Sequence, residues 1–172
     1  MTDASRPSPA DLVLRPMRPE DVPAAERLCR ASRWNQTTRE WDLFLRVAGD
    51  HCLVAELEGR VVGTAVTTVY DEAVAWIAMV LVDPAERGRG IGRTLLARAI
   101  AGAPAGCAPS LDATPAGRGL YLTLGFSDEY ALTRFRGDVT KEPVVTGTAS
   151  GRRMQLAAAG DLEEIIELEV EF

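Results

Sequence analysis

Three glycines and three arginines alternate through one short stretch of this sequence, RGRGIGR at residues 87–93. Glycine reaches backbone angles closed to other residues and lets a ligand approach the main chain closely. The amide N–H groups of such a turn can converge on an anion, which the field of a following helix also favours. Arginine adds forked donors that suit phosphate oxygens. The stretch therefore predicts a cradle for a phosphate or diphosphate group.

Two familiar nucleotide-binding patterns do not fit this cradle. The phosphate loop of nucleotide hydrolases needs Gly-Lys-Ser/Thr, and the chain has Gly92-Arg93-Thr94. The dinucleotide fingerprint fails because Arg93 stands where its third glycine belongs after Gly88 and Gly90. A solvated helix start without a ligand is the plain structural alternative, and it is disfavoured because glycines at a helix start cost stability.

The segments on either side of the cradle show what must position it. Residues 74–82, VAWIAMVLV, are apolar on both faces and predict a central strand covered on both sides. Residues 90–101 predict a helix that begins in the cradle. Glu58-Gly59 is a hairpin signal. The other expected strands are 11–17, 51–58, 60–70, 110–113 and 129–137, and the other expected helices are 18–32, 37–49 and 115–126. This order predicts a mixed α/β sheet.

The cradle and two further segments resemble one known family. RGRGIG matches the R/Q-x-x-G-x-G/A signature of the GNAT superfamily of acetyl-CoA-dependent N-acetyltransferases. MVLVDP resembles that family's central strand, and GLYLTLGF, residues 119–126, resembles its helix with a Tyr ending in Gly-Phe. The order of elements agrees from Leu12 through Phe135. The resemblance implies a GNAT-like α/β fold, a mixed and largely antiparallel sheet flanked by helices, and N-acetyl transfer from acetyl-CoA to a primary amine of a small molecule or peptide.

The resemblance also implies roles for particular residues. Main-chain groups near Gly90 would hold the diphosphate of coenzyme A, and those of Leu81 and Val82 would pair with the pantetheine arm. Tyr121 would protonate the departing thiolate; its alternative is a core aromatic, because leucines surround it. The coenzyme site so implied consists of Leu81, Val82, Arg87, Gly88, Arg89, Gly90, Ile91, Gly92 and Arg93.

A catalytic base is harder to find in the sequence. An alkylamine is almost wholly protonated at neutral pH, so a base or a water chain to one is useful. The expected strand 74–82 contains no carboxylate. Asp112 is the candidate base, and its alternative is a role at the end of a strand or as a helix cap. Asp71 and Glu72 are further candidates, but their position at the hairpin favours a role as solvated turn residues. Thr114 stands where many relatives have Asn seven positions before the Tyr.

The acceptor side is indicated only by the segment between the first two expected helices. In the family this segment often forms one wall of the acceptor cleft. Trp34 and Asn35 are the candidate wall residues here, whereas Trp41 has helical spacing with Phe44 and predicts a core position. His51 has a structural or surface role as its simplest reading.

Composition limits the class of protein. The chain has 172 residues, 47% hydrophobic and 26% charged, which suits a globular domain. A net charge of −6 argues against nucleic acid or an anionic membrane as the main partner. One histidine argues against a Cys/His zinc site, so no metal is expected, and three separated cysteines predict free thiols in the cytoplasm. No apolar run is long enough to span a membrane.

Domain boundaries are predicted from composition and from a short internal sequence similarity. Residues 1–10 read as a disordered tail, 11–136 as the acetyltransferase domain and 137–151 as a linker. Residues 152–172 resemble the first expected strand and helix shifted by 140 positions, which predicts the start of a second GNAT-like repeat or a terminal strand-helix. A catalytically weak CoA-binding regulatory domain, a nucleotide- or phosphate-binding module, and a homodimer stay open as alternatives.

Overall fold

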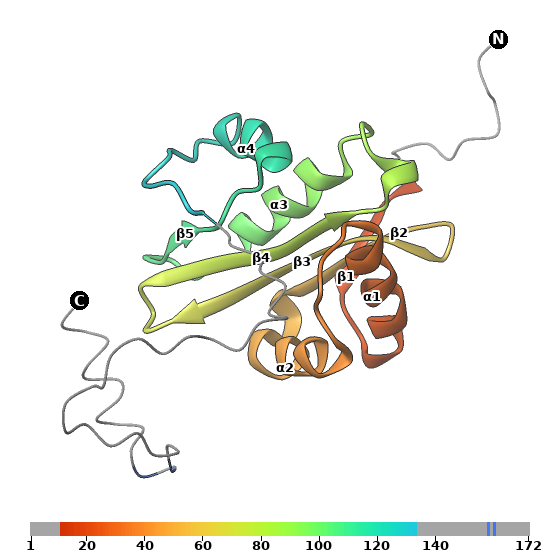
Figure 1. Ribbon diagram of the computed structural model, residues 1–172, viewed down its shortest axis with the longest axis horizontal. Helices are drawn as coiled ribbons and strands as arrows, with labels where there is room; N and C mark the ends of the chain where they lie inside the picture. The colour runs from red at the N-terminus through yellow and green to blue at the C-terminus, as the bar shows by residue number, and fades with distance from the viewer. Residues whose placement is uncertain (1–10, 134–157, 159, 161–172) are drawn as a thin grey trace, which may run out of the picture. The chain divides into compact units, whose positions relative to one another are not determined.

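The computed structural model describes residues 11–133, 158 and 160 (Figure 1). Apart from those last two exposed positions, the predicted tail, linker and second repeat lie outside the described residues. The chain divides into two compact units, Met1–Glu129 and Tyr130–Phe172, and the fold below belongs to the first. Within the described part, none of the helices has the length and apolar character needed to cross a bilayer.

The described part of the first unit is built on a five-stranded sheet in the order β1-β2-β3-β4-β5. The first four strands are antiparallel to their neighbours, and β5 runs parallel to β4. This confirms the mixed, largely antiparallel sheet. The strands are β1 (Val13–Pro16), β2 (Cys52–Leu57), β3 (Arg60–Tyr70), β4 (Val74–Val82) and β5 (Ala108–Ser110).

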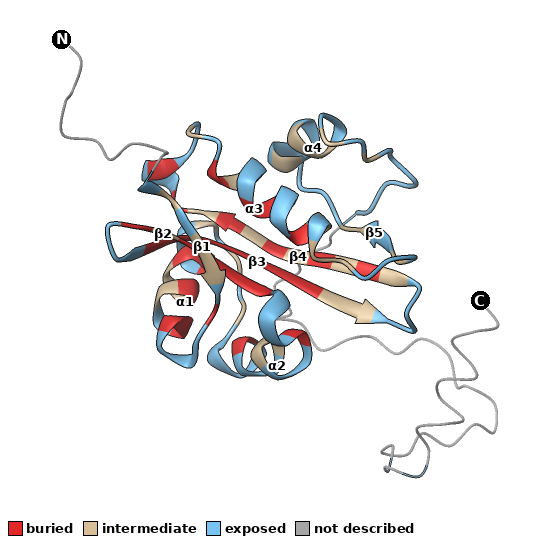
Figure 2. Cartoon of the chain, turned by 180° about the vertical axis from the view of Figure 1, so that it is seen from behind, coloured by how far each residue is buried: buried red, intermediate tan, exposed pale blue. Residues whose placement is uncertain are grey.

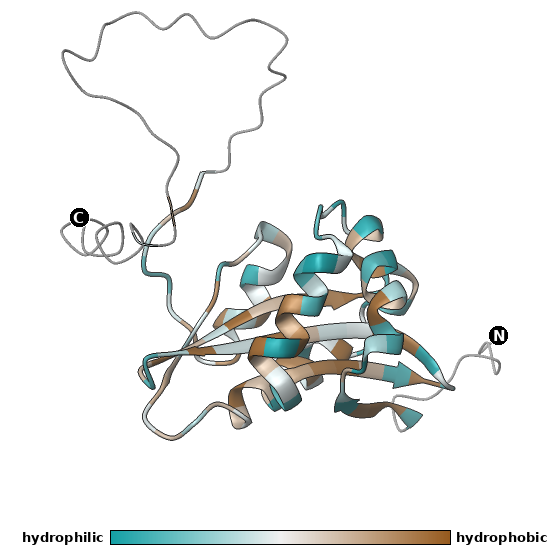
Figure 3. Cartoon of the chain, turned by 90° about the horizontal axis from the view of Figure 1, so that it is seen from below, coloured by the Kyte–Doolittle hydropathy of each residue, from teal (hydrophilic) through white to brown (hydrophobic). Residues whose placement is uncertain are grey.

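Helices cover both faces of this sheet. Figure 1 shows helices on both sides of the sheet, and Figure 2 shows that the buried residues of these helices face the strands, except in the last described helix, which has no buried residue. Hydrophobic colour in Figure 3 follows the strands, as a core between helical layers requires. The helices are α1 (Val22–Ala31) and α2 (Thr38–Ala48) on one face and α3 (Ile91–Ala101) and α4 (Pro115–Leu122) on the other, with short 3₁₀ turns η2 (Pro19–Asp21), η3 (Gly49–His51) and η4 (Pro84–Glu86).

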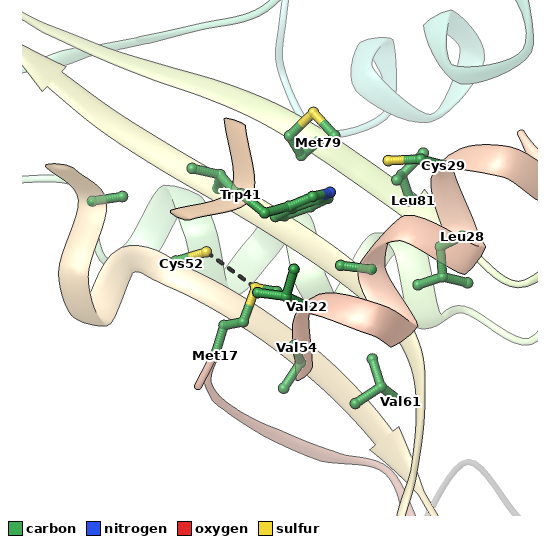
Figure 4. Packing of buried hydrophobic residues seen from close by; sticks show 13 residues of the cluster. Met17, Val22, Leu28, Cys29, Trp41, Cys52, Val54, Val61, Met79 and Leu81 are labelled. Carbon is green, nitrogen blue, oxygen red and sulfur yellow. Dashed lines mark hydrogen bonds between the residues drawn. The ribbon is translucent and has the colours of Figure 1, made fainter. Parts of the chain in front are cut away.

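The core under α1 and α2 is centred on Trp41, which is fully buried as its helical spacing predicted (Figure 4). Its ring meets Phe44 edge-on at 5.7 Å between centroids. Cys52 lies here too, with its sulfur 3.4 Å from that of Met17, and burial raises the pKa of this thiol to about 12. Cys29 and Cys107 are also free thiols, in agreement with the sequence analysis.

Most expected elements lie close to their predicted bounds, but the last ones do not. The hairpin at Glu58-Gly59 is confirmed, with both residues at positive φ. The strand expected at 110–113 is wrong: β5 lies at Ala108–Ser110, because its three residues pair with β4 residues 74–76. The helix expected to reach 126 ends at Leu122. Residues 129–133 form no strand, and the rest of that predicted strand lies outside the described residues.

The pairing of strand β4 with β3 has an irregularity in register that the sequence of β4 does not predict. Thr64 pairs with Leu81, and Val66 pairs with Ala78. One residue of β3 therefore lies opposite two residues of β4, at positions 79 and 80. Met79 takes a left-handed φ of 54°, and its carbonyl accepts a hydrogen bond from Thr64 Oγ1 at 2.7 Å. Ala78 and Met79 therefore both contact the core under α1 and α2, which is the behaviour of a β-bulge.

Candidate functional site

A groove of about 740 Å³ opens where β4 and β5 part. β5 pairs with β4 only at residues 74–76, so the β5-facing edge of residues 77–82 has no strand beside it within the described residues. An extended ligand can pair with such an edge through main-chain hydrogen bonds. The end of α1, the second half of β4, the turn after β4 and helix α4 line the groove.

The structure brings most of the predicted site residues into this one groove. Its lining includes Leu81, Val82, Arg87, Gly88, Gly90, Ile91, Gly92 and Arg93. Tyr121 and Trp34 line it from opposite faces of the sheet. Arg89, Asn35 and Asp112 are not among the lining residues.

Two glycines of the turn have left-handed backbones, with φ of 77° at Gly88 and 81° at Gly90. A Cβ added at either position would meet no protein atom within 4 Å, so both face open space. Gly90 is also the residue before α3, where unpaired N–H groups and the helix field favour an anion. The turn thus has the room and the donors that a diphosphate requires.

Two arginines bring positive charge to the groove without a carboxylate partner among the described residues. The Nε of Arg87 donates to the carbonyl of Val82 at 3.1 Å. The Nη2 of Arg93 donates to Thr123 Oγ1 at 2.7 Å. Because these partners are neutral, both guanidinium charges remain available to an anionic ligand.

Behind the turn lies a group of ion pairs that the sequence analysis missed. Glu86 accepts from Arg60 at 2.6 Å and also pairs with Arg89. Burial alone would raise the pKa of Glu86, but its two arginine partners outweigh this and hold the pKa below its ordinary value. The spacing of three between Glu86 and Arg89 was the available signal; Arg60 is distant in the chain.

Tyr121 lies half-buried on α4 beside the groove. Desolvation raises the pKa of its hydroxyl, so it stays protonated at neutral pH. Its ring meets Phe126 at 6.2 Å and packs against Gly117, where an added Cβ would lie 2.9 Å from Cε2. The sequence analysis did not single out Gly117, although residues four apart share a helix face. Thr114 caps α4, accepting from the N–H of Gly117 at 3.2 Å.

None of the candidate bases is brought to the groove. Asp112 is exposed in the loop after β5, and Asp71 and Glu72 form the turn between β3 and β4. Among the described lining residues, Glu86 is the sole carboxylate, and two arginines already hold it. His51 lies in η3, outside the lining.

Comparison with known proteins agrees with this geometry. The acetyltransferase (GNAT) family model matches residues 16–126. A candidate acetyltransferase from Pyrococcus horikoshii superposes with a TM-score of 0.65 and 25% identity over 81% of this chain, which spans only 56% of that protein. An acetyltransferase from Trypanosoma brucei is 26% identical with a TM-score of 0.61, covering 73% of this chain and 99% of its own.

A third similar structure holds a ligand. It is a Mycobacterium tuberculosis protein in complex with CoA, 25% identical with a TM-score of 0.58, covering 72% of this chain and 76% of its own. No curated protein sequence matches the chain at a significant level.

Proposed function

This chain belongs to the GNAT acetyltransferase family, and we propose that it moves an acetyl group from acetyl-CoA to a primary amine of a small molecule or peptide by direct attack. The observation that carries the proposal is the groove along the open edge of β4, where the glycine turn, Tyr121 and two arginines without a carboxylate partner in the described part of the chain meet. The CoA bound to the similar M. tuberculosis protein supports the choice of donor.

The coenzyme end of the groove is the glycine turn. Main-chain N–H groups of residues 88–92 would bind the diphosphate, and Arg87 and Arg93 would add charge-assisted hydrogen bonds. Main-chain groups of Leu81 and Val82, on the open edge of β4, would pair with the amides of the pantetheine arm. The open space in front of Gly88 and Gly90 supports this assignment.

The reacting end lies between α4 and the end of α1. A neutral amine would attack the thioester carbon, forming the C–N bond as the C–S bond breaks. The thiolate would take a proton from the hydroxyl of Tyr121, and the amine would release its extra proton to water, since no free carboxylate lines the groove among the described residues. Trp34 would form one acceptor wall; Asn35 and Asp112 stay sequence predictions.

Two measurements test the proposal. Calorimetry with CoA should show binding to the full chain, and acetyl-CoA mixed with alkylamines, amino acids and peptides should release thiol with one of these classes. CoA binding without release for any amine would favour a regulatory domain. Binding of ATP in place of CoA would favour the phosphate-binding alternative.

Replacement of the proposed acid separates chemistry from binding. Tyr121→Phe should lower kcat about 100-fold, the lower end of general acid catalysis, while the Kd for CoA stays within about twofold. Tyr70→Phe, at the exposed end of β3, is the matched control and should leave both values unchanged. An unaltered kcat in Tyr121→Phe would remove this residue from the mechanism.

A further inference from the structure

Five charged side chains of alternating sign form a continuous chain behind the glycine turn. Asp83 Oδ2 accepts from Arg27 at 2.8 Å and from Arg60 at 3.2 Å. Arg60 then bridges to Glu86 at 2.6 Å, and Glu86 pairs with Arg89. The chain therefore connects α1 and the start of β3 to the turn that follows β4.

The five charged side chains differ in how far they are exposed to solvent, and the two nearest the glycine turn, Glu86 and Arg89, are among the most buried of the five. Glu86 is 7% exposed and the side chain of Arg89 is 12% exposed, whereas that of Arg60 is 50% exposed. The exposed guanidinium is screened by water, but the pair between Glu86 and Arg89 is largely desolvated. A desolvated charge that loses its partner must move toward water. If Glu86 lost its charge, Arg89 would therefore leave its place and move the turn with it.

Main-chain bonds hold only the beginning of this turn. The N–H of Asp83 donates to the Val62 carbonyl at 2.8 Å, and that of Glu86 donates to the Asp83 carbonyl at 2.8 Å. From residue 87 to the start of α3, the described hydrogen bonds that fix the turn come from side chains, chiefly Arg87 to Val82 and Arg89 to Glu86. The pair of Glu86 and Arg89 is thus the last anchor before Gly90.

We propose that Glu86 is a positioning residue for coenzyme binding: it holds the side chain of Arg89 against the body of the domain, so that the main chain of residues 88–92 faces the groove. Glu86 then acts through Arg89, while Arg87 and Arg93 are the cations that meet the ligand. This inference rests on the proposed function, because it takes coenzyme A as the occupant of the groove.

The test uses Glu86→Gln in the full chain, which keeps the shape and removes the charge. The Kd for CoA should rise about tenfold, as expected when a displaced turn loses part of its hydrogen bonding to an anion. Dephospho-CoA, which keeps the diphosphate, should lose the same factor. In the free protein, amide hydrogen exchange at residues 88–92 should become faster.

A matched control separates positioning from general stability. Asp21 is 8% exposed and pairs with Arg15, which also pairs with Glu56, and none of the three lines the groove. Asp21→Asn removes a carboxylate of similar burial and should lower Tm while the Kd for CoA stays within about twofold. A second variant, Arg89→Met, should weaken CoA several-fold, and combining it with Glu86→Gln should add nothing further, because the two residues act as one unit.

The outcomes are distinct. If the unaltered chain fails to bind CoA, the proposed function falls and this inference falls with it. If it binds CoA and Glu86→Gln binds equally well with unchanged exchange at residues 88–92, this inference alone is overturned. Additive losses in the double variant would show Arg89 contacting the ligand directly, which also overturns it.

Discussion

Two turns flank strand β4, and both use left-handed backbone. The one before it, between β3 and β4, places Asp71 at φ 50° and Glu72 at φ 55°, and closes with a bond from the Ala73 N–H to the Tyr70 carbonyl at 3.0 Å. The one after it places Gly88 at φ 77° and Gly90 at φ 81°. The first turn carries two side chains; the second carries none at its left-handed positions.

This difference identifies what the glycines contribute. A left-handed residue with a side chain costs roughly 1–2 kcal/mol, and the chain tolerates that cost at Asp71 and Glu72. At Gly90 the backbone has φ 81° and ψ −3°, a pair of angles that glycine adopts more readily than other residues, so the angle accounts for part of the choice of glycine. What the second turn gains is a bare main chain facing open space, which a ligand can approach.

The largest effect is expected when a charged side chain is placed on the second turn. Gly90→Glu adds bulk and negative charge where the diphosphate would bind, so the Kd for CoA should rise by more than about 100-fold, given Coulomb repulsion at close range. Calorimetry measures the loss, and circular dichroism should show an intact fold.

Gly106→Glu is the matched control for this change. Gly106 also has a positive φ, of 95°, faces open space and lies outside the groove lining. It should incur a similar backbone strain and keep its affinity for CoA. Unchanged affinity in Gly90→Glu, or an equal loss in both variants, would contradict the role assigned to the turn.

A smaller effect should appear on acidification, because the second turn is held by carboxylates. Burial would raise the pKa of Asp83 and Glu86, but the hydrogen bonds and arginines around them hold both pKa values below the ordinary 3.8 and 4.5. The unfolded chain then binds these protons more readily than the folded one, so their contribution to stability is present above those ordinary values and is lost as pH falls below them.

The measurement is Tm against pH. From about pH 5 downward the Tm should fall, and Glu86→Gln should show a shallower fall because one of the linked groups is gone. Parallel curves for the two proteins would show that Glu86 does not contribute to this acid sensitivity.

The smallest effect belongs to the first turn. Asp71→Gly removes a left-handed cost of roughly 1 kcal/mol but adds about 0.5–1 kcal/mol of backbone entropy to the unfolded state. The free energy of unfolding should therefore stay within about 1 kcal/mol, and the Kd for CoA should not change. A marked loss of CoA affinity would mean that the two turns are not functionally separate.

Patterns local in the chain predicted most of the fold and most of the residues that line the groove at the glycine turn. The run VAWIAMVLV and the hairpin at Glu58-Gly59 carry their structure in adjacent residues, as does the stretch RGRGIG. β5 was misplaced because its three residues, one of them Pro109, become a strand only through pairing with β4. Its position is a property of the sheet rather than of its own sequence.

Features that depend on distant partners were not predictable in this way. The ion pair of Arg27 with Asp83 joins residues 56 positions apart, and that of Arg60 with Glu86 spans 26. The bulge at Met79 has no glycine to mark it, and its carbonyl is held by Thr64 of another strand. Each is decided by packing that no short window of sequence contains.

The bulge gives β4 one position at which its length can change during evolution. Ala78 and Met79 already face the same side, so losing one of them would restore strict alternation and leave every later side chain on its present face. Losing any other residue between 75 and 81 would move the side chains that follow it to the opposite face of the sheet. A deletion at the bulge would instead draw the turn back by about 3.3 Å, the rise of one strand residue. Descendants of this chain could therefore adjust the depth of the groove without rebuilding the interior.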